Sequence, residues 1–263
     1  MGQDQVGETV TLWCAVGAAD FGRIEADEWR SVPEGAHLQV FTDRAEAVRV
    51  AREKIVAAEG VAHVLRLQVR EAFFAEGSTV GAAAPTGERS IPGAGNAAGK
   101  GAGNAAGDGA GNAAGDGVEA AALTEHLAGV IVEAADFRGP VPAGDFADGP
   151  ELPEAWRAYL QSPSWIRRGW LTSGKYVWLY PPTEGRDLLK IWEAEPRFPG
   201  IALIAGDGGL ENFVLDLRQT PPPVLMLSNA SETWDDAILQ APDVTDFINR
   251  IEDGSFDLVW SQS

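Results

Sequence analysis

The sequence predicts an α+β fold, because segments patterned like strands and segments patterned like helices both occur along its 263 residues. In several segments apolar residues alternate with other residues, which is typical of strands. Other segments repeat apolar residues at helical spacing behind a capping residue. An Asp-Gly turn at 206–209 separates two apolar runs and predicts a β-hairpin, since glycine tolerates positive φ. The length suggests one or two domains.

The first half of the chain contains predicted strands and helices in alternation. Residues 10–16 predict a strand, and Asp20 is the predicted N-cap of a helix that reaches Trp29. An apolar patch follows at 38–41. Asp43 and Glu46 have the spacing of a capping box, and the helix behind them is predicted to end at Gly60. Further strands are predicted at 61–69 and 127–132.

Three consecutive eight-residue repeats interrupt this half, at 93–100, 101–108 and 109–116. Their small residues offer little surface to bury, and their glycines raise the entropic cost of ordering. We therefore predict a flexible surface insertion over 82–117. The repeated glycines superficially resemble a dinucleotide-binding loop, but no predicted strand precedes them, so this interpretation is rejected.

The second half begins after a segment rich in Pro, Gly and Asp, at 140–150, which predicts a domain boundary. A helix is predicted at 152–160 and a strand at 175–180, which Pro181 ends. The hairpin follows, with Phe213, Leu215 and Leu217 expected in the core. The last elements are a strand at 224–227 and a helix over 244–251 capped by Asp243. Five tryptophans are expected in core or half-buried positions, namely Trp156, Trp165, Trp170, Trp178 and Trp192.

The chain is acidic along its whole length, with 39 acidic and 20 basic residues and a formal net charge of −19. Residues 1–149 contain 22 acidic and 11 basic residues, and 150–263 contain 17 and 9. Such a field disfavours nucleic acid and anionic membranes and favours basic protein partners. A role in solubility alone is an equal alternative.

Neither membrane insertion nor export is expected from the sequence. No apolar run approaches the roughly 18 residues that span a bilayer. The first ten residues lack the basic region and apolar core of a signal peptide. The single cysteine, Cys14, excludes an intrachain disulfide and a thiolate metal cluster. A cytoplasmic protein is therefore expected.

The histidines and the cysteine do not form a known catalytic or metal-binding motif. His37, His63 and His126 are far apart in the sequence, and their spacing fits no metal-binding pattern. His63 lies on the apolar side of its predicted strand, so we predict a core histidine with a hydrogen-bonding partner. Cys14 alternates with apolar residues and is predicted to be a buried thiol.

Carboxylates are too numerous for any pair of them to indicate a site. Asp207 with Glu211, or Asp235 with Asp236, offers oxygen ligands to a hard cation, but neither pair matches a known loop. A solvated acidic turn is the preferred interpretation. We therefore predict no catalytic residue, no metal site and no cofactor.

The second half resembles the SUKH superfamily in four segments that occur in the family's order. These are LPEAWRAYL (152–160), FPGIALIAGDGGLENFVLDLR (198–218), PPVLMLS (222–228) and VTDFINRI (244–251). The resemblance implies an α+β domain with a mostly antiparallel sheet and flanking helices. The bacterial members of the SUKH superfamily are largely immunity proteins that neutralise toxins, often nucleases. One departure is that Ser162-Pro163-Ser164 stands where the family commonly has Asn-Gly-Gly.

The first half more faintly resembles the ADP-ribosyltransferase-like group. The resemblance rests on residues 11–13 with Val16-Gly17, on VFTDRAEAVRVARE (40–53), on HVLRLQV (63–69) and on HLAGVIVEAADF (126–137). It implies a degenerate, non-catalytic domain. Active members carry a basic residue where this chain has Trp13-Cys14. They also use a glutamate late in the domain, for which Glu125 or Glu133 is the candidate here, without the partner residues that a nicotinamide site needs. The implied organisation is a domain at 8–139 interrupted by 82–117, a linker at 140–150, and a SUKH-like domain at 151–263.

The leading functional hypothesis is an immunity-type protein that binds a basic toxin, often a nuclease in this family, and occludes its active surface. An acidic face would speed association, and buried anchors would supply affinity. One alternative is an enzyme with an ADP-ribosyltransferase-like domain and a SUKH-like recruitment domain. Another is a non-catalytic regulatory scaffold. The candidate partner-binding residues are Asp207, Glu211, Trp234, Asp235 and Asp236.

Overall fold

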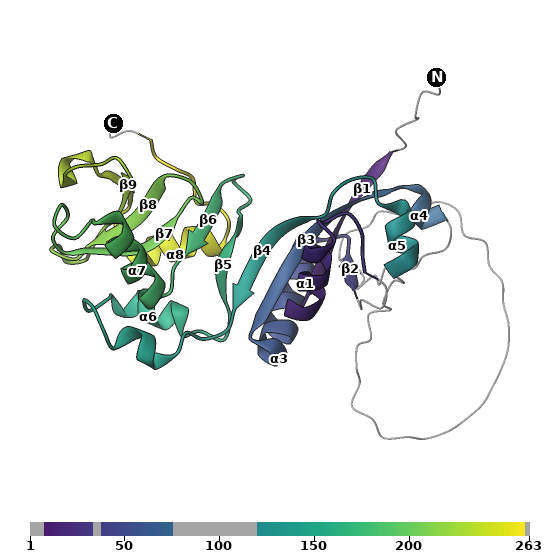
Figure 1. The fold of residues 1–263 in the computed structure, drawn as a ribbon, viewed down its shortest axis with the longest axis horizontal. Coiled ribbons are helices and arrows are strands. Elements are labelled where there is room, and N and C mark those ends of the chain that lie inside the picture. Colours follow the sequence, from purple (N-terminus) through teal and green to yellow (C-terminus); the bar gives the residue numbers. More distant parts are fainter. Residues whose placement is uncertain (1–7, 34–37, 76–119, 261–263) are drawn as a thin grey trace.

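A single ten-stranded antiparallel sheet runs through the computed structural model, which describes residues 8–33, 38–75 and 120–260 (Figure 1). The strand order is β10-β9-β8-β7-β6-β5-β4-β3-β1-β2. Sequential strands are therefore neighbours, except that β1 lies between β3 and β2. The strands are β1 (Thr9–Val16), β2 (Gln39–Phe41), β3 (Val61–Arg70), β4 (Val132–Arg138), β5 (Trp165–Trp170), β6 (Tyr176–Leu179), β7 (Ile201–Gly206), β8 (Glu211–Asp216), β9 (Val224–Ser228) and β10 (Ile238–Ala241).

Helices cover both faces of the sheet and lie in two groups, one near each end (Figure 1). The first group is α1 (Ala18–Ala26), the continuous segment α2 (Arg44–Val50), η1 (Ala51–Val56) and α3 (Ala57–Glu59), and α4 (Ala72–Ala75) with α5 (Ala120–His126). The second group is η2 (Ala143–Phe146), α6 (Glu154–Leu160), α7 (Pro182–Trp192), η3 (Trp234–Asp236) and α8 (Val244–Glu252). None of the described helices is long and apolar enough to cross a membrane.

In the first half, the structure confirms the strands predicted at 10–16 and 61–69 and corrects two other boundaries. Helix α1 begins after Gly17 rather than at Asp20, whose carboxylate instead pairs with Arg23 within the helix. The strand predicted at 127–132 is wrong, because β4 only begins at Val132. Leu127 makes a single bridge to Val69 before the chain turns away at Gly129. The repeats and the predicted insertion lie outside the described residues.

In the second half, the hairpin, strand β9 and the last helix confirm the sequence predictions. The Asp243 carboxylate caps α8 by accepting hydrogen bonds from two backbone amides in its first turn. The sequence patterns missed β5, α7 and β10. Strand β5 places two arginines in mid-strand, so it lacks simple alternation. Helix α7 starts with Pro182 in its first turn, where proline is common, so Pro181-Pro182 both ends β6 and begins a helix.

The largest core lies on one face of the sheet and includes residues from both halves of the chain, among them Ala15, Val64, Trp156, Leu215 and Phe247. Helices α2, α6 and α8 contribute to it. On the opposite face, one core lies beneath α1 and α5, and another lies beneath α7. Between those two cores, the register aligns Asp136 with Arg168 and Arg168 with Trp178. This face therefore carries polar and aromatic residues at the centre of the sheet.

Strand β4 precedes the predicted linker at 140–150 and β5 follows it, and the two strands pair, so the sheet continues from one half of the chain to the other. Gly169 permits this pairing, since a Cβ there would lie 2.6 Å from the Ala134 carbonyl oxygen. An ion pair between Arg52 and Glu252 also joins the two helix groups. The structure thus confirms an α+β chain with a large antiparallel sheet, while its division into two domains stays a prediction.

Candidate functional site

The turn between β7 and β8 holds two of the predicted partner-binding residues. Asp207 Oδ1 accepts hydrogen bonds from the backbone nitrogens of Gly209 (2.7 Å) and Glu211 (3.2 Å). Gly208 has a φ of 79°, which favours glycine at that position. Asp207 therefore stabilises the turn and also gives it a negative charge. Leu210, which the sequence reasoning passed over, lies between the two acids and is 65% exposed.

Glu211 lies at the first position of β8 and is half-buried. Burial and the neighbouring Asp207 carboxylate both raise the pKa of Glu211. The two carboxylates therefore form a locally negative edge around Leu210, and no arginine or lysine among the described residues pairs with either of them. This edge is the part of the hairpin that faces solvent.

The other three predicted residues lie at η3, after β9. The Trp234 ring packs against Phe198 (5.4 Å between centroids), and the Arg218 guanidinium lies 4.5 Å from its centre. Asp236 caps its own segment by accepting hydrogen bonds from two backbone nitrogens, which lower its pKa. Asp235 is exposed, and within the described chain its carboxylate makes no hydrogen bond or ion pair. Of these three, Asp235 is the one free to contact a partner.

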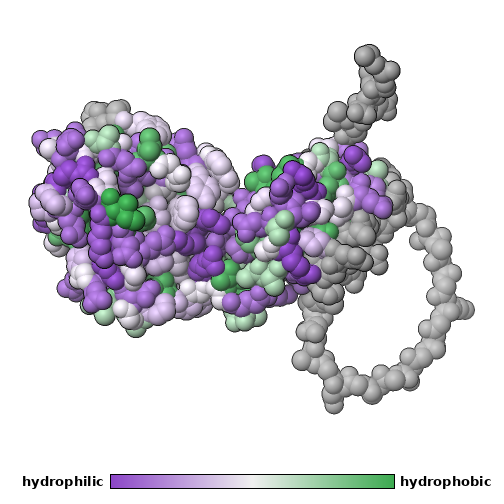
Figure 2. Space-filling view, in the orientation of Figure 1, coloured by the Kyte–Doolittle hydropathy of each residue, from purple (hydrophilic) through white to green (hydrophobic). Residues whose placement is uncertain are grey.

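Hydrogen bonds connect the acidic turn to the end of α7. Asn229 donates its backbone N–H to the Leu210 carbonyl (3.0 Å), and Trp192 Nε1 donates to the Asn229 carbonyl (3.1 Å). Ile191, next to Trp192, is 80% exposed. We name Ile191, Trp192, Asp207, Leu210 and Glu211 the hairpin surface. Figure 2 shows a small apolar patch over α7 within a largely hydrophilic surface.

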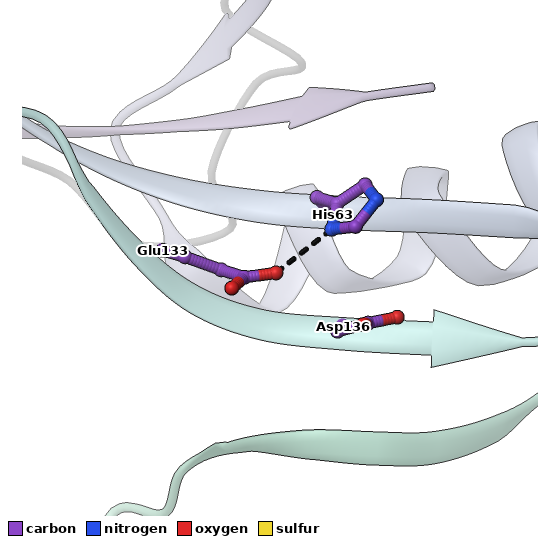
Figure 3. A group of neighbouring side chains, drawn as sticks. All are labelled: His63, Glu133 and Asp136. Atoms are coloured by element: carbon purple, nitrogen blue, oxygen red, sulfur yellow. Dashed lines mark hydrogen bonds and ion pairs between the residues drawn. The ribbon is translucent and has the colours of Figure 1, made fainter. Parts of the chain in front are cut away.

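A second candidate is a group of charged side chains where β3, β4 and β5 meet (Figure 3). His63 lies opposite Asp136 in the register, and Leu65 lies opposite Glu133, with a β-bulge between the two pairs. In a regular strand residues three apart point to opposite faces. The bulge cancels that offset and brings Glu133 and Asp136 to the same face as His63. We name these three residues the junction triad.

Two arginines bind the carboxylates of the junction triad. His63 Nδ1 lies 2.8 Å from Glu133 Oε1, and Arg168 Nη2 donates to Glu133 Oε2 at 3.1 Å. Arg138 Nη2 donates to Asp136 Oδ2 at 2.9 Å, and Arg168 Nε lies 3.4 Å from the same oxygen. Each carboxylate therefore has one oxygen held by an arginine, while the second oxygen of Glu133 contacts His63 and that of Asp136 has no hydrogen-bond partner within the described structure.

The junction triad is largely shielded from water. The Phe21 ring stacks on His63 with 3.6 Å between the ring centres. Asp136 is 1% exposed, and its Oδ1 atom has no hydrogen-bond partner within the described structure. Burial raises the pKa of Asp136, although both arginines and His63 act to lower it. This buried carboxylate thus has charged neighbours but lacks a hydrogen-bond partner for one of its oxygens.

The structure confirms His63 as a buried histidine with a partner, and it supplies residues that the sequence reasoning missed. From the sequence, Glu133 is a candidate only through the family resemblance, and Asp136 and Arg168 are not candidates. Their convergence depends on a bulge, which alternation in a sequence does not reveal. An Asp-x-Arg pattern at 136–138, within a strand, was the available signal.

The remaining candidate groups do not converge on a site. Cys14 is fully buried, and burial raises the pKa of its thiol, as expected of a structural cysteine. Trp13 is half-buried with the Arg44 guanidinium 5.8 Å from its ring centre. Glu125 is exposed at the surface of α5. His37 lies outside the described residues.

No family model matches the chain, and no curated protein matches it.

Proposed function

We propose that the chain is an immunity-type binding protein of the cytoplasm, which neutralises a toxin by occluding its active surface. In this proposal residues 151–263 form a SUKH-like domain, and residues 8–139 form a non-catalytic ADP-ribosyltransferase-like domain. The antiparallel sheet and the hairpin at 201–216 are compatible with the family resemblance. The protein acts by binding, without a catalytic residue of its own.

The observation that carries the proposal is the pair of exposed aliphatic side chains on the hairpin surface. Leu210 is 65% and Ile191 is 80% exposed. A few side chains that a partner buries fully supply most of the affinity at a protein interface, and surrounding polar residues form the rim. Asp207 and Glu211 flank Leu210, so this surface combines apolar anchors with a negative rim.

The negative rim and the net charge of −19 specify the kind of partner. A toxin that acts on nucleic acid presents a basic substrate-binding surface, which the acidic rim complements. Long-range attraction raises the association rate and falls with ionic strength, whereas the aliphatic contacts slow dissociation. We therefore expect a salt-dependent association rate and a nearly salt-independent dissociation rate.

The test is titration of the toxin domain encoded beside the chain's own gene. The purified full chain is added at increasing ratio to that domain, and toxin activity and complex formation are both measured. The proposal expects stoichiometric inhibition. Failure of the chain to bind or inhibit any toxin encoded beside it would overturn the proposal.

A further inference from the structure

We propose that the junction triad binds a divalent first-row transition-metal ion, with His63, Glu133 and Asp136 as its protein ligands. One ligand atom from each residue lies within 4.8 Å of the others, across two adjacent strands (Figure 3). This inference goes beyond the binding function proposed above and uses none of the hairpin surface. It also revises the expectation from sequence that the chain has no metal site.

The unpartnered oxygen of Asp136 is the observation that points to a ligand. Buried side-chain oxygens in proteins nearly always have a hydrogen-bond partner, so an exception requires an explanation. Asp136 is 1% exposed, and its Oδ1 lacks any partner within the described structure. An ion at the triad would coordinate this oxygen and remove the penalty of leaving it unbound.

The two arginines act as the outer support that metal ligands commonly have. Arg168 holds Glu133 Oε2 and Arg138 holds Asp136 Oδ2, which fixes the orientation of both carboxylates. The remaining oxygens, together with His63 Nδ1, are the donors available to an ion. Groups that orient metal ligands in this way raise affinity by roughly 10- to 100-fold.

The donor set selects the class of ion. One imidazole nitrogen and two carboxylate oxygens suit Zn²⁺ and its neighbours in the first transition row, whereas Ca²⁺ and Mg²⁺ prefer oxygen ligands alone. An ion bound by His63 Nδ1 and Glu133 Oε1 replaces the hydrogen bond between them, because a nitrogen lone pair that binds a metal cannot also carry a proton. Three protein ligands leave a fourth tetrahedral position for water or an anion.

An entry path exists on the side of the carboxylates. The side chains of Glu133 and Arg168 are 18% and 28% exposed, whereas Phe21 closes the side of His63. Because the arginines already balance the charge of the carboxylates, the ion adds positive charge to the site. We therefore expect weaker binding than at a structural site of four cysteines.

The test measures binding of Zn²⁺ to the full, tag-free chain by calorimetry, together with the visible absorption of Co²⁺. We expect one ion per chain at this site and a Co²⁺ spectrum typical of four-coordinate geometry. Asp136→Asn and Glu133→Gln should each weaken Zn²⁺ binding by at least about tenfold, in line with loss of a ligand. Asp216→Asn is the matched control, because Asp216 is 2% exposed in the same sheet but has both oxygens bonded.

Circular dichroism of each variant separates loss of a ligand from loss of the fold. Glu133→Gln is the variant least at risk, since its side chain is partly exposed. Selective loss of Zn²⁺ binding in folded Glu133→Gln, with retention in Asp216→Asn, supports the site. The proposal is overturned if the wild-type chain binds no Zn²⁺ or Co²⁺, or if both triad variants bind as tightly as the wild type.

Discussion

The β7–β8 hairpin and the β3–β4–β5 junction use their carboxylates in opposite ways. In the hairpin, Asp216 is 2% exposed and both of its oxygens accept hydrogen bonds, from Arg218 and Gln219. At the junction, Asp136 is equally buried, but one of its oxygens has no partner. The pKa of Asp216 is lowered by Arg218, whereas burial raises the pKa of Asp136.

Both aspartates accept a hydrogen bond from an arginine two positions later, so the difference lies in their further partners. Asp216 is satisfied by residues two and three positions later, so its site forms whenever the hairpin forms. The other contacts of the junction triad are long-range, since Glu133 contacts His63 and Arg168 over separations of 70 and 35 residues, across three strands and a bulge. No such partner reaches Asp136 Oδ1 within the described structure, so the junction retains capacity for a further ligand.

The hairpin scaffold gives the largest expected effect. Leu215 is fully buried in the core that both halves share, so Leu215→Ala leaves a cavity and should cost about 2–5 kcal/mol of unfolding free energy. Urea unfolding measures it. A cost below about 1 kcal/mol would show that the hairpin strands are not core elements.

The two buried aspartates give the next largest effect. Asp216→Asn removes charge-assisted hydrogen bonds and should cost about 1.5–3 kcal/mol, whereas Asp136→Asn, measured without added metal, should cost less. Arg218 is half-exposed and can be rehydrated, which limits the loss. Urea unfolding of both variants side by side checks the order. An equal or larger cost for Asp136→Asn would contradict the contrast between the two sites.

The pH dependence of stability sharpens the same contrast. Because its folded-state pKa is lowered, ionised Asp216 contributes stability that is present above the ordinary carboxyl pKa. That stability is lost as the pH falls through the lowered value. Asp216→Asn should therefore flatten the decline in unfolding free energy between about pH 5 and pH 2. A parallel acid decline in wild type and variant would show that other carboxylates dominate it.

The acidic turn gives a smaller effect. Asp207 bonds two backbone nitrogens of its own turn, so Asp207→Ala should cost about 0.5–1.5 kcal/mol. A charge reversal at Asp207 is therefore expected to perturb the turn as well as the binding of a basic partner. Asp235→Ala, at an exposed carboxylate without a partner in the described chain, is the control and should change stability by less than about 0.5 kcal/mol. Thermal unfolding distinguishes the two variants.

Local signals explain what the sequence predicted correctly. The Asp-Gly turn, the Asp243 cap and the alternation of residues 61–69 each depend on neighbours within a few positions. Strand β5 was missed because Arg167 and Arg168 break its alternation, and they serve contacts with β6 and β4. Alternation could not predict the junction triad either, because a bulge determines which residues of β4 share a face with His63.

The exposure of Leu210 was also beyond prediction, since alternation assigns residues to the two faces of a strand and not a residue in the turn before it. That its neighbours Asp207 and Glu211 contact a partner stays a prediction, and the structure gives Asp207 a role in the turn itself. The leucine between them, together with Ile191 from α7, is what distinguishes the hairpin surface from an ordinary acidic loop.

The most direct test of the proposed function is the affinity of the double variant Ile191→Ala/Leu210→Ala for the toxin encoded beside the gene. Both side chains are exposed, so the fold should be unchanged, and loss of two interface anchors should weaken binding by about 30-fold or more. Val130→Ala, at a 58% exposed position in the other half, is the matched control and should bind like the wild type. Unchanged affinity of the double variant would contradict the assignment of the hairpin surface as the binding site.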